Sequence, residues 1–381
     1  MHISTVLSIL TLSLSIFGAP VDKRSLSSSS IPKFHTLDFD IVDVTPSSLK
    51  REKTETIYRR TLYYFARVTI GSTKQQIGVT VDTGSADLWF PSNDATCTGG
   101  NDCKSLGTFT PAISNTFHNL STPVNNNYGD GDGASGYWGK DDYWFTDGTK
   151  VEQIQFGLMN SVGRETGVLG LGLPDLEATN EKYPNFPAAL KNAGIIDKTA
   201  YSLYLNLATA SSGSVVFGAI DKAKYTGDLA VLDFADYTWT AIKLDSVTAP
   251  DGTKIDLNIP VALDSGTTYI QLDTAVAKQI YQTLGLSESG SASCDQLSLD
   301  NNQLTLNFAG VSITIPYKSL FYQFGGGSLC QARIYGSNDG NNFFGDLFLQ
   351  NAYVAFNLDS KKVGLAKANY NDATDLVDFW F

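Results

Sequence analysis

Two short segments of the sequence resemble each other, and each contains one aspartate that could do chemistry. Residues 78–85 end in Asp82-Thr-Gly-Ser, and residues 260–267 end in Asp264-Ser-Gly-Thr. Each segment begins as an apolar, strand-like run. Asp and Gly are poor in strand interiors, so we expect both strands to end in a loop at the aspartate. A single Asp-Thr-Gly would be read as an ordinary turn.

A second signal follows each aspartate in the same order and at nearly the same spacing. Gly170, in Val-Leu-Gly-Leu-Gly, lies 88 positions after Asp82, and Gly345, in Phe-Phe-Gly-Asp, lies 81 positions after Asp264. Chance explains one short match easily but explains a paired recurrence poorly. The pattern predicts a duplication with two similar lobes, each carrying one Asp loop.

Two such loops can perform acyl hydrolysis if the lobes pack about a pseudo-twofold axis. Two carboxylates a few Å apart do not both ionise readily, so the pair holds one proton over an acidic window. The ionised carboxylate can take a proton from a water molecule, while the protonated one donates to a scissile carbonyl oxygen. We therefore predict that Asp82 and Asp264 are the catalytic pair. The sequence does not say which of them carries the proton.

The residues after each aspartate are predicted to support it. We expect the adjacent hydroxyls to tie the two loops together, the next hydroxyls to donate to the outer carboxylate oxygens, and the glycines to permit close backbone approach. In that order, these residues are Thr83 and Ser265, Ser85 and Thr267, and Gly84 and Gly266. Thr268 completes the second motif as a candidate substrate-binding residue.

A glycine-rich segment between the repeats begins Tyr128-Gly129-Asp130-Gly. It reads either as a plain β-hairpin tip or as a lid that closes over substrate, with Tyr128 directed into the site. Trp89 is either a core aromatic or the donor that holds the Tyr128 hydroxyl through its indole N–H.

The few histidines and cysteines limit the kinds of catalytic site that the chain can form. Of three histidines, His2 and His35 precede the predicted mature chain, which leaves His118. One histidine does not make a multi-histidine zinc site, and no Gly-x-Ser-x-Gly motif accompanies it. The chemistry is therefore expected to depend on carboxylates. The four cysteines allow three disulfide pairings, of which Cys97–Cys103 with Cys294–Cys330 is the most local.

Composition describes a folded, acidic, extracellular protein. The 381 residues are 42% hydrophobic and carry a net charge of −12, which argues against nucleic acid and membrane surfaces as partners. This negative net charge would favour either solubility or function at acidic pH. Residues 1–18 read as a secretory signal, too short to span a bilayer, and no GPI-type tail closes the chain.

Elsewhere the pattern is short strands between turns, which predicts a mainly β fold in two lobes. The clearest strands are expected at residues 63–71, 200–207, 213–218, 304–308 and 352–358, and the best helices at 187–193 and 274–284. We expect a pro-segment at 19–51, an N-terminal lobe with Asp82 and the flap at 52–232, and a C-terminal lobe with Asp264 at 233–381.

These motifs resemble the pepsin-like aspartic proteases, and among them the candidapepsin-like secreted enzymes of yeasts. The resemblance spans roughly residues 54–370. It rests on residues 82–89 and 264–268, on the flap at 128–131, and on landmarks at 200–206, 216–218, 223–227, 345–346 and 362–366. Ala86 and Phe343-Phe344 depart from the commoner residues, which affects the shape of the pockets rather than the carboxylates.

The resemblance implies a bilobal β fold with a deep active-site cleft between the lobes. It also implies endoproteolysis in acid of extended polypeptides bound as a strand beneath the flap. It implies inhibition by pepstatin-type inhibitors and two local disulfides, as in the pairing above. We expect a monomer without metal or organic cofactor.

The same resemblance implies a zymogen whose pro-segment ends at a Lys-Arg pair. Cleavage after Lys50-Arg51 is preferred, since cleavage after Arg60 removes much of the expected mature N-terminal strand. Arg24 is an early trimming site. Asn119-Leu-Ser121 is a candidate N-glycosylation acceptor.

Two rival functions remain at this point. An inactive, protease-like binding protein would be favoured by loss of either aspartate or of Tyr128, but all three are present. A wall-attached processing enzyme specific for basic sites is disfavoured by the missing anchor signal.

Overall fold

The computed structural model describes residues 33–43, 62–100, 102–129, 131–236, 238–323 and 327–381. The predicted signal, the processing pair Lys50 and Arg51, the other dibasic pairs and the flap residue Asp130 lie outside the described residues. Within the described residues, no helix is both long and apolar enough to cross a bilayer.

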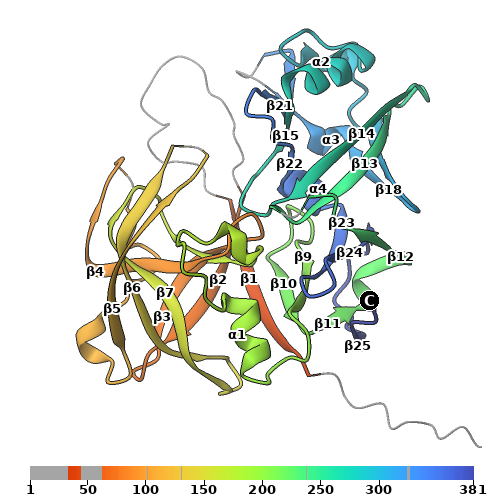
Figure 1. Cartoon of the computed structure of the whole chain (residues 1–381). Helices are drawn as coiled ribbons and strands as arrows, with labels where there is room; N and C mark the ends of the chain where they lie inside the picture. Colours follow the sequence, from red (N-terminus) through yellow and green to blue (C-terminus); the bar gives the residue numbers. More distant parts are fainter. Residues whose placement is uncertain (1–32, 44–61, 101, 130, 237, 324–326) are drawn as a thin grey trace, which may run out of the picture. The chain divides into compact units, whose positions relative to one another are not determined.

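The described residues form a mainly β structure whose largest sheet has 13 strands (Figure 1). In spatial order its strands are β12 (Tyr225–Asp233), β24 (Lys362–Ala368), β23 (Ala352–Asn357), β9 (Ala200–Tyr204), β10 (Ser212–Phe217), β1 (His35–Asp43), β2 (Leu62–Ile70), β3 (Gln75–Asp82), β8 (Gly167–Gly170), β4 (Leu88–Cys97), β7 (Lys150–Val162), β6 (Gly133–Trp144) and β5 (His118–Asn127). The sheet therefore joins strands from both ends of the sequence.

A second sheet of seven strands carries the second Asp motif. Its order is β18 (Val311–Pro316), β17 (Gln303–Phe308), β13 (Ala241–Thr248), β14 (Lys254–Leu263), β22 (Phe343–Phe344), β15 (Ile270–Asp273) and β21 (Ile334–Ser337). Smaller sheets pair β11 (Ala219–Asp221) with β25 (Leu376–Asp378), and β16 (Ser291–Ser293) with β20 (Leu329–Ala332) and β19 (Phe321–Gln323).

Four short α-helices accompany the described strands: α1 (Phe186–Asn192), α2 (Thr274–Thr283), α3 (Tyr317–Leu320) and α4 (Asp346–Leu349). The expected strands and the two expected helices are found to within a few residues. Pro187 lies in the first turn of α1, where its missing N–H costs nothing. Asp273 caps α2 by accepting from the Ala275 N–H at 2.8 Å.

The duplicated motif pairs correspond to two parallel strand contacts. β3 runs parallel to β8, with Asp82 opposite Gly170, and β14 runs parallel to β22, with Leu263 opposite Phe344. The apolar residues that lead up to the two aspartates, Val79 and Val81 in β3 and Val261 and Leu263 in β14, are fully buried. The recurring apolar-Gly signal is therefore the parallel partner of each aspartate-bearing strand.

Strand β1 lies inside the segment predicted to be removed on maturation. It pairs with β10 on one side and with β2 on the other, so it fills an interior position of the 13-stranded sheet. Leu37 and Phe39 are buried, and the Phe39 ring lies edge-on to Tyr64 at 5.4 Å between centroids. The segment at 35–43 is thus packed as part of the sheet.

Both of the most local disulfides are formed. Cys97 is bonded to Cys103, and Cys294 to Cys330. Each bridge closes a loop within one half of the sequence, in agreement with the pairing that the resemblance implied.

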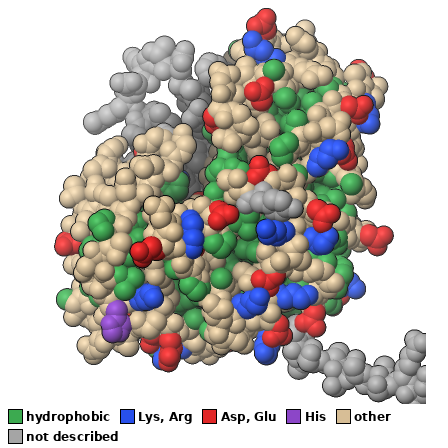
Figure 2. Space-filling view, viewed as in Figure 1, with side chains coloured by type: hydrophobic (Ala, Val, Ile, Leu, Met, Phe, Trp, Pro, Cys, Tyr) green, Lys and Arg blue, Asp and Glu red, His purple; other side chains and the backbone are tan. Residues whose placement is uncertain are grey.

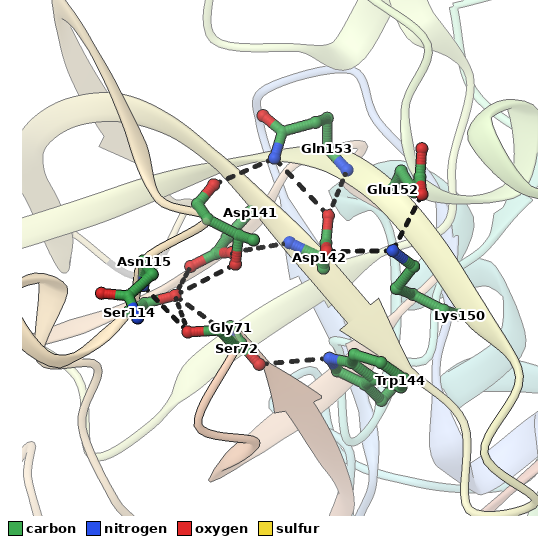
Figure 3. Close-up of polar contacts among 11 residues, drawn as sticks. Gly71, Ser72, Ser114, Asn115, Asp141, Asp142, Trp144, Lys150, Glu152 and Gln153 are labelled. Carbon is green, nitrogen blue, oxygen red and sulfur yellow. Dashed lines mark hydrogen bonds and ion pairs between the residues drawn. The ribbon is translucent and has the colours of Figure 1, made fainter.

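A buried carboxylate anchors β6 far from the flap end of that strand (Figure 3). Asp141 is fully buried and accepts hydrogen bonds from Ser114 Oγ and Thr116 Oγ1, both at 2.6 Å. Gly71 has φ +83°, and a Cβ there would lie 2.8 Å from Ser114 Oγ. The Trp144 indole N–H donates to the Gly71 carbonyl at 3.1 Å. These hydrogen bonds hold the Trp144 end of β6, and the opposite end of β6 forms the flap.

Charged side chains of both signs are interspersed on the face drawn in Figure 2, with apolar side chains scattered between them. Such a surface does not present one large field of a single sign on that face.

Candidate active site

Asp82 and Asp264 lie at the ends of β3 and β14, where the two loops meet. Asp82 is 7% exposed. Its Oδ1 accepts the backbone N–H of Gly84 at 2.8 Å, and its Oδ2 accepts the hydroxyl of Ser85 at 2.5 Å. The carboxylate is thereby held by its own loop in one orientation, because both oxygens have a fixed donor.

The second loop repeats this arrangement. Asp264 is 9% exposed, its Oδ1 accepts the N–H of Gly266 at 2.8 Å, and its Oδ2 accepts the Thr267 hydroxyl at 2.7 Å. The roles expected of the hydroxyls at the fourth position of each motif are therefore observed in both loops.

Thr83 and Ser265 tie the loops to each other reciprocally. The Thr83 N–H donates to Ser265 Oγ at 3.1 Å, and the Ser265 N–H donates to Thr83 Oγ1 at 3.0 Å. The hydroxyls donate in turn to carbonyls of the opposite strand, Thr83 to Leu263 at 2.7 Å and Ser265 to Val81 at 2.9 Å. Four hydrogen bonds thus fix the separation of the two loops.

The glycines of both motifs leave room for the opposite carboxylate. A Cβ built on Gly84 would lie 2.5 Å from Cγ of Asp264, and one built on Gly266 would lie 2.6 Å from Oδ1 of Asp82. No real side chain fits at these distances, so only glycine permits the two carboxyl groups to approach.

The two carboxyl groups interact directly. Burial first, and then the negative charge of Asp82, raise the pKa of Asp264 to about 7. Hydrogen bonds from Thr267 and Gly266 lower the pKa of Asp264, but by less than the other causes raise it. The pair therefore retains a proton on Asp264 well above the pH at which an isolated aspartate loses it.

Tyr128 stands at the tip of the β5–β6 hairpin. The Trp89 indole N–H donates to the Tyr128 hydroxyl at 2.5 Å, which is one of the two interpretations that the sequence left open for Trp89, and the side chain is also fully buried. Burial and the nearby charge of Asp82 raise the Tyr128 pKa well above its usual value, so the hydroxyl keeps its proton. Gly129 is exposed, and Asp130 lies outside the described residues.

Two further predicted residues have positions but no identified role. Thr268 is half-buried beside Thr267. Asn119 is exposed on β5, and its side-chain oxygen accepts the Ser121 N–H at 2.7 Å. In the described part of the chain, no group of three or more His, Cys, Asp or Glu side chains is arranged to hold a metal ion.

Sequence reasoning missed a buried polar cluster behind the Asp82 loop. The carboxyl of Asp87 accepts the Tyr183 hydroxyl at 2.7 Å and the Ala178 N–H at 2.8 Å. Glu177 accepts the Tyr183 N–H at 3.2 Å, and burial raises its pKa to about 7. Asp87 lies inside the first motif, but Glu177 and Tyr183 are about 90 residues away, and no pattern in the sequence joins them.

A second buried aspartate lies behind the Asp264 loop. Asp346 is 3% exposed, and its N–H donates to the Thr267 carbonyl at 2.8 Å. Burial raises its pKa, the charge of Asp264 adds to this, and Arg333 opposes it. Its sequence signal was the Gly-Asp pair at 345–346, which had been read only as a landmark.

Comparison with known proteins agrees with this geometry. The family model described as eukaryotic aspartyl protease matches residues 63–368, most of the chain. Secreted aspartic protease 5 of Candida albicans is 34% identical, and the alignment covers 99% of both chains. Candidapepsin-1 of Candida albicans is also 34% identical with 99% of both chains covered, and Candidapepsin-3 is 33% identical, with 93% of this chain and 95% of the relative covered.

The match to the family model and the near-complete coverage of these relatives agree with the mainly β structure and its paired Asp loops. The chain therefore belongs to the eukaryotic aspartyl protease family and is a secreted aspartic-type endopeptidase with the pepsin-like fold.

Proposed function

We propose that Asp82 and Asp264 are the catalytic pair of this enzyme and that they cleave polypeptides in acid through an activated water molecule. One observation supports this most strongly: two carboxyl groups from separate sheets lie so close that a Cβ built on Gly266 would lie 2.6 Å from Asp82 Oδ1 and 3.1 Å from Asp264 Oδ1, and each carboxyl is also held by its own loop. Neither loop alone would create a shared proton.

In this mechanism Asp264 begins protonated and Asp82 begins ionised. Asp82 takes a proton from a water molecule as the water oxygen attacks the carbonyl carbon of the scissile bond. Asp264 gives its proton to the carbonyl oxygen, which yields a neutral tetrahedral intermediate. When that intermediate collapses, the carbon–nitrogen bond breaks and the nitrogen leaves with a proton from Asp82. One hydroxyl of the intermediate returns its proton to Asp264, so the product carboxyl group forms without a covalent enzyme intermediate and both aspartates regain their starting states.

The activity depends on the proton held by Asp264, so it should be confined to acid. That proton is lost as the pH rises through the raised pKa of about 7. Activity should therefore fall on the alkaline side as this group ionises, because two adjacent negative charges cannot supply a general acid.

An extended peptide, bound as a strand, is the substrate that fits a hairpin flap. Tyr128, Gly129 and Asp130 on the flap, together with Thr268, are the proposed substrate contacts, and Trp89 holds the Tyr128 hydroxyl. Pepstatin-type inhibitors, which mimic the tetrahedral intermediate, should bind the same site. The enzyme is proposed to act as a monomer.

The enzyme is further proposed to be made as a zymogen cleaved after Arg51. The position of β1 supports a structural role for the removed segment, since residues 35–43 pair with two neighbouring strands. Release of β1 would leave β10 and β2 with unpaired edges, and an unpaired edge recruits another strand. The new N-terminus, from Glu52 onward, is the nearest chain that can fill the gap. Sequencing the N-terminus of the secreted protein tests the cleavage site.

The catalytic assignment is tested with the substitutions Asp82→Asn and Asp264→Asn. Each keeps the side-chain shape but removes the acid–base function, so we expect peptide cleavage at acidic pH to fall at least a thousandfold. Asp251→Asn, at an exposed turn, is the matched control and should retain full activity. Substantial turnover by either active-site variant, with folding shown by circular dichroism, would refute the assignment.

A further inference from the structure

The flap tyrosine makes a second contact that the sequence did not suggest. The guanidinium carbon of Arg164 lies 4.4 Å from the centroid of the Tyr128 ring, within the range of a cation–π interaction. Trp89 binds the hydroxyl of the same side chain, and the Trp89 and Tyr128 rings are 6.4 Å apart at an angle of 40°. The tyrosine is thus contacted at its hydroxyl by one residue and on its ring face by another.

Arg164 reaches the flap from a segment that is tied to the catalytic strand. It lies between β7 and β8, and β8 pairs in parallel with β3, which ends at Asp82. The neighbouring residue Gly163 donates its N–H to the carbonyl of Gly133, at the start of flap strand β6, at 2.9 Å. The segment that carries Arg164 therefore contacts the flap hairpin on one side and leads directly into the partner strand of Asp82 on the other.

Geometry and environment both favour a positioning role for this contact. Arg164 is half-buried, so its attraction to the ring is less screened by water than that of a fully exposed pair. The guanidinium is planar and can stack on an aromatic face while its N–H groups keep other partners. The Tyr128 backbone is held within the hairpin, since its N–H donates to the Asp132 carbonyl at 2.9 Å and its carbonyl accepts the Gly131 N–H at 3.1 Å, so the contact with Arg164 restrains the side chain.

We propose that Arg164 is a positioning residue for peptide hydrolysis, which clamps the Tyr128 ring in the orientation that receives substrate. The inference rests on the proposed function in one respect, namely that Tyr128 covers the bound peptide. Arg164 acts through the tyrosine and takes no part in the transfer of protons between Asp82, water and Asp264.

A clamp of this kind acts on the population of flap orientations before substrate binds. If the ring is released, only a fraction of molecules holds it in the receptive orientation, and the apparent affinity falls by that fraction. Once the peptide is bound, its own contacts hold the flap, so the chemical step is little affected. Loss of the clamp should therefore raise KM and leave kcat nearly unchanged.

The test compares Arg164→Gln, Arg164→Lys and the charge-matched control Arg67→Gln in the secreted enzyme. Arg67 is exposed on β2. For one neutral peptide substrate in acid, we expect Arg164→Gln to raise KM about three- to tenfold with kcat within twofold of the parent. The lysine variant should recover most of the loss, since an ammonium also binds a ring face. The Arg67 variant should match the parent, and an equal rise in its KM would overturn the proposal.

A double-mutant comparison establishes whether Arg164 acts through the ring. Tyr128→Phe keeps the ring and loses the hydroxyl, whereas Tyr128→Val removes the ring. The effect of Arg164→Gln on kcat/KM should persist in the phenylalanine background and disappear in the valine background. If it persists in the valine background, Arg164 acts in another way and the proposal fails.

These outcomes are separate from those of the catalytic assignment. Failure of the aspartate pair appears as turnover by Asp82→Asn whatever the residue at position 164. An unchanged KM in Arg164→Gln, with Asp82→Asn inactive, would overturn only the clamp.

Discussion

The loop of Asp82 and the loop of Asp264 share their internal hydrogen bonds but differ in their surroundings. In each, the aspartate accepts a backbone N–H from the glycine two positions later and a hydroxyl from the residue three positions later. In each, the intervening hydroxyl residue crosses to the other loop. These shared hydrogen bonds set the positions of the two carboxyl groups.

The surroundings are asymmetric. Behind Asp82 lies a hydrogen-bonded cluster in which Asp87 has two donors, Tyr183 and Ala178. Behind Asp264 lies the carboxyl of Asp346, whose Oδ1 has no hydrogen-bond partner among the described residues. The negative charge of Asp82 helps to raise the pKa of the flap residue Tyr128. The comparison indicates that the symmetric hydrogen bonds bring the two carboxyls together, whereas the groups behind the two loops differ.

The largest expected effect comes from filling the space between the two loops. Gly84→Ala pushes against the carboxyl of Asp264, and Gly266→Ala pushes against that of Asp82. Displacement of a catalytic group by about 1 Å can cost about a hundredfold, so we expect kcat/KM to fall at least that far in both variants. Steady-state kinetics on one peptide substrate measures it.

Gly194→Ala serves as the control for this pair. It follows α1, and a Cβ there meets no atom within 4 Å, although its φ of +71° disfavours alanine. It should lose some stability while keeping its specific activity. If Gly84→Ala or Gly266→Ala kept full activity, the close approach of the carboxyls would not be required for catalysis.

A smaller effect is expected from the hydrogen bonds that cross between the loops. Thr83→Ala leaves the buried N–H of Ser265 and the carbonyl of Leu263 without their partner. A buried group left unsatisfied typically costs about 1–3 kcal/mol, so we expect the free energy of unfolding to fall by about that much. Urea denaturation measures this, and Thr83→Ser, which keeps the hydroxyl, should lose less.

The corresponding substitution in the second loop tests whether the two loops contribute equally to stability. Ser265→Ala removes the corresponding bonds and should cost a similar amount, and the double variant should lose less than the sum, since the two hydroxyls belong to one network. Strict additivity would mean that the two hydroxyls act independently.

Much of the site was predictable because the relevant signals are local in the sequence. The motif around each aspartate contains its own donors within three residues, so Gly84 and Ser85, and their counterparts Gly266 and Thr267, could be assigned from spacing alone. The paired recurrence of the apolar-Gly segments likewise predicted a duplication, and the structure adds that these segments are the parallel partner strands β8 and β22. Local patterning also predicted most strands and both longer helices.

The residues that were missed depend on contacts between distant segments. Glu177 and Tyr183 meet Asp87 only because β8 brings the following loop behind the first motif. Arg164 meets Tyr128 across 36 positions, with no repeat or motif to mark it. The strand at 35–43 was assigned to a removable segment, and nothing in its sequence indicated that it would occupy the interior of a sheet. Such juxtapositions follow from the topology, which short motifs do not specify.

The smallest expected effect distinguishes the cluster behind Asp82 from the catalytic pair itself. Burial raises the pKa of Glu177 to about 7, the charges of Asp87 and Asp175 add to this, and Lys182 opposes it. The folded state thus binds this proton more tightly than the unfolded state. The resulting stability is fully present below about pH 4.5 and is lost as the pH rises toward 7.

Glu177→Gln removes this titration, so its urea midpoint should fall less between pH 4 and pH 7 than that of the parent. Both proteins carry Asp82→Asn in this comparison, which prevents self-digestion. Glu181→Gln, an exposed change in the same loop, should leave the parent's pH dependence unaltered. If Glu177→Gln also left it unaltered, the loss of stability toward neutral pH would have to arise at the other carboxyls whose pKa burial raises, Asp87, Asp264 and Asp346, and Glu177 would support the Asp82 loop without sensing pH.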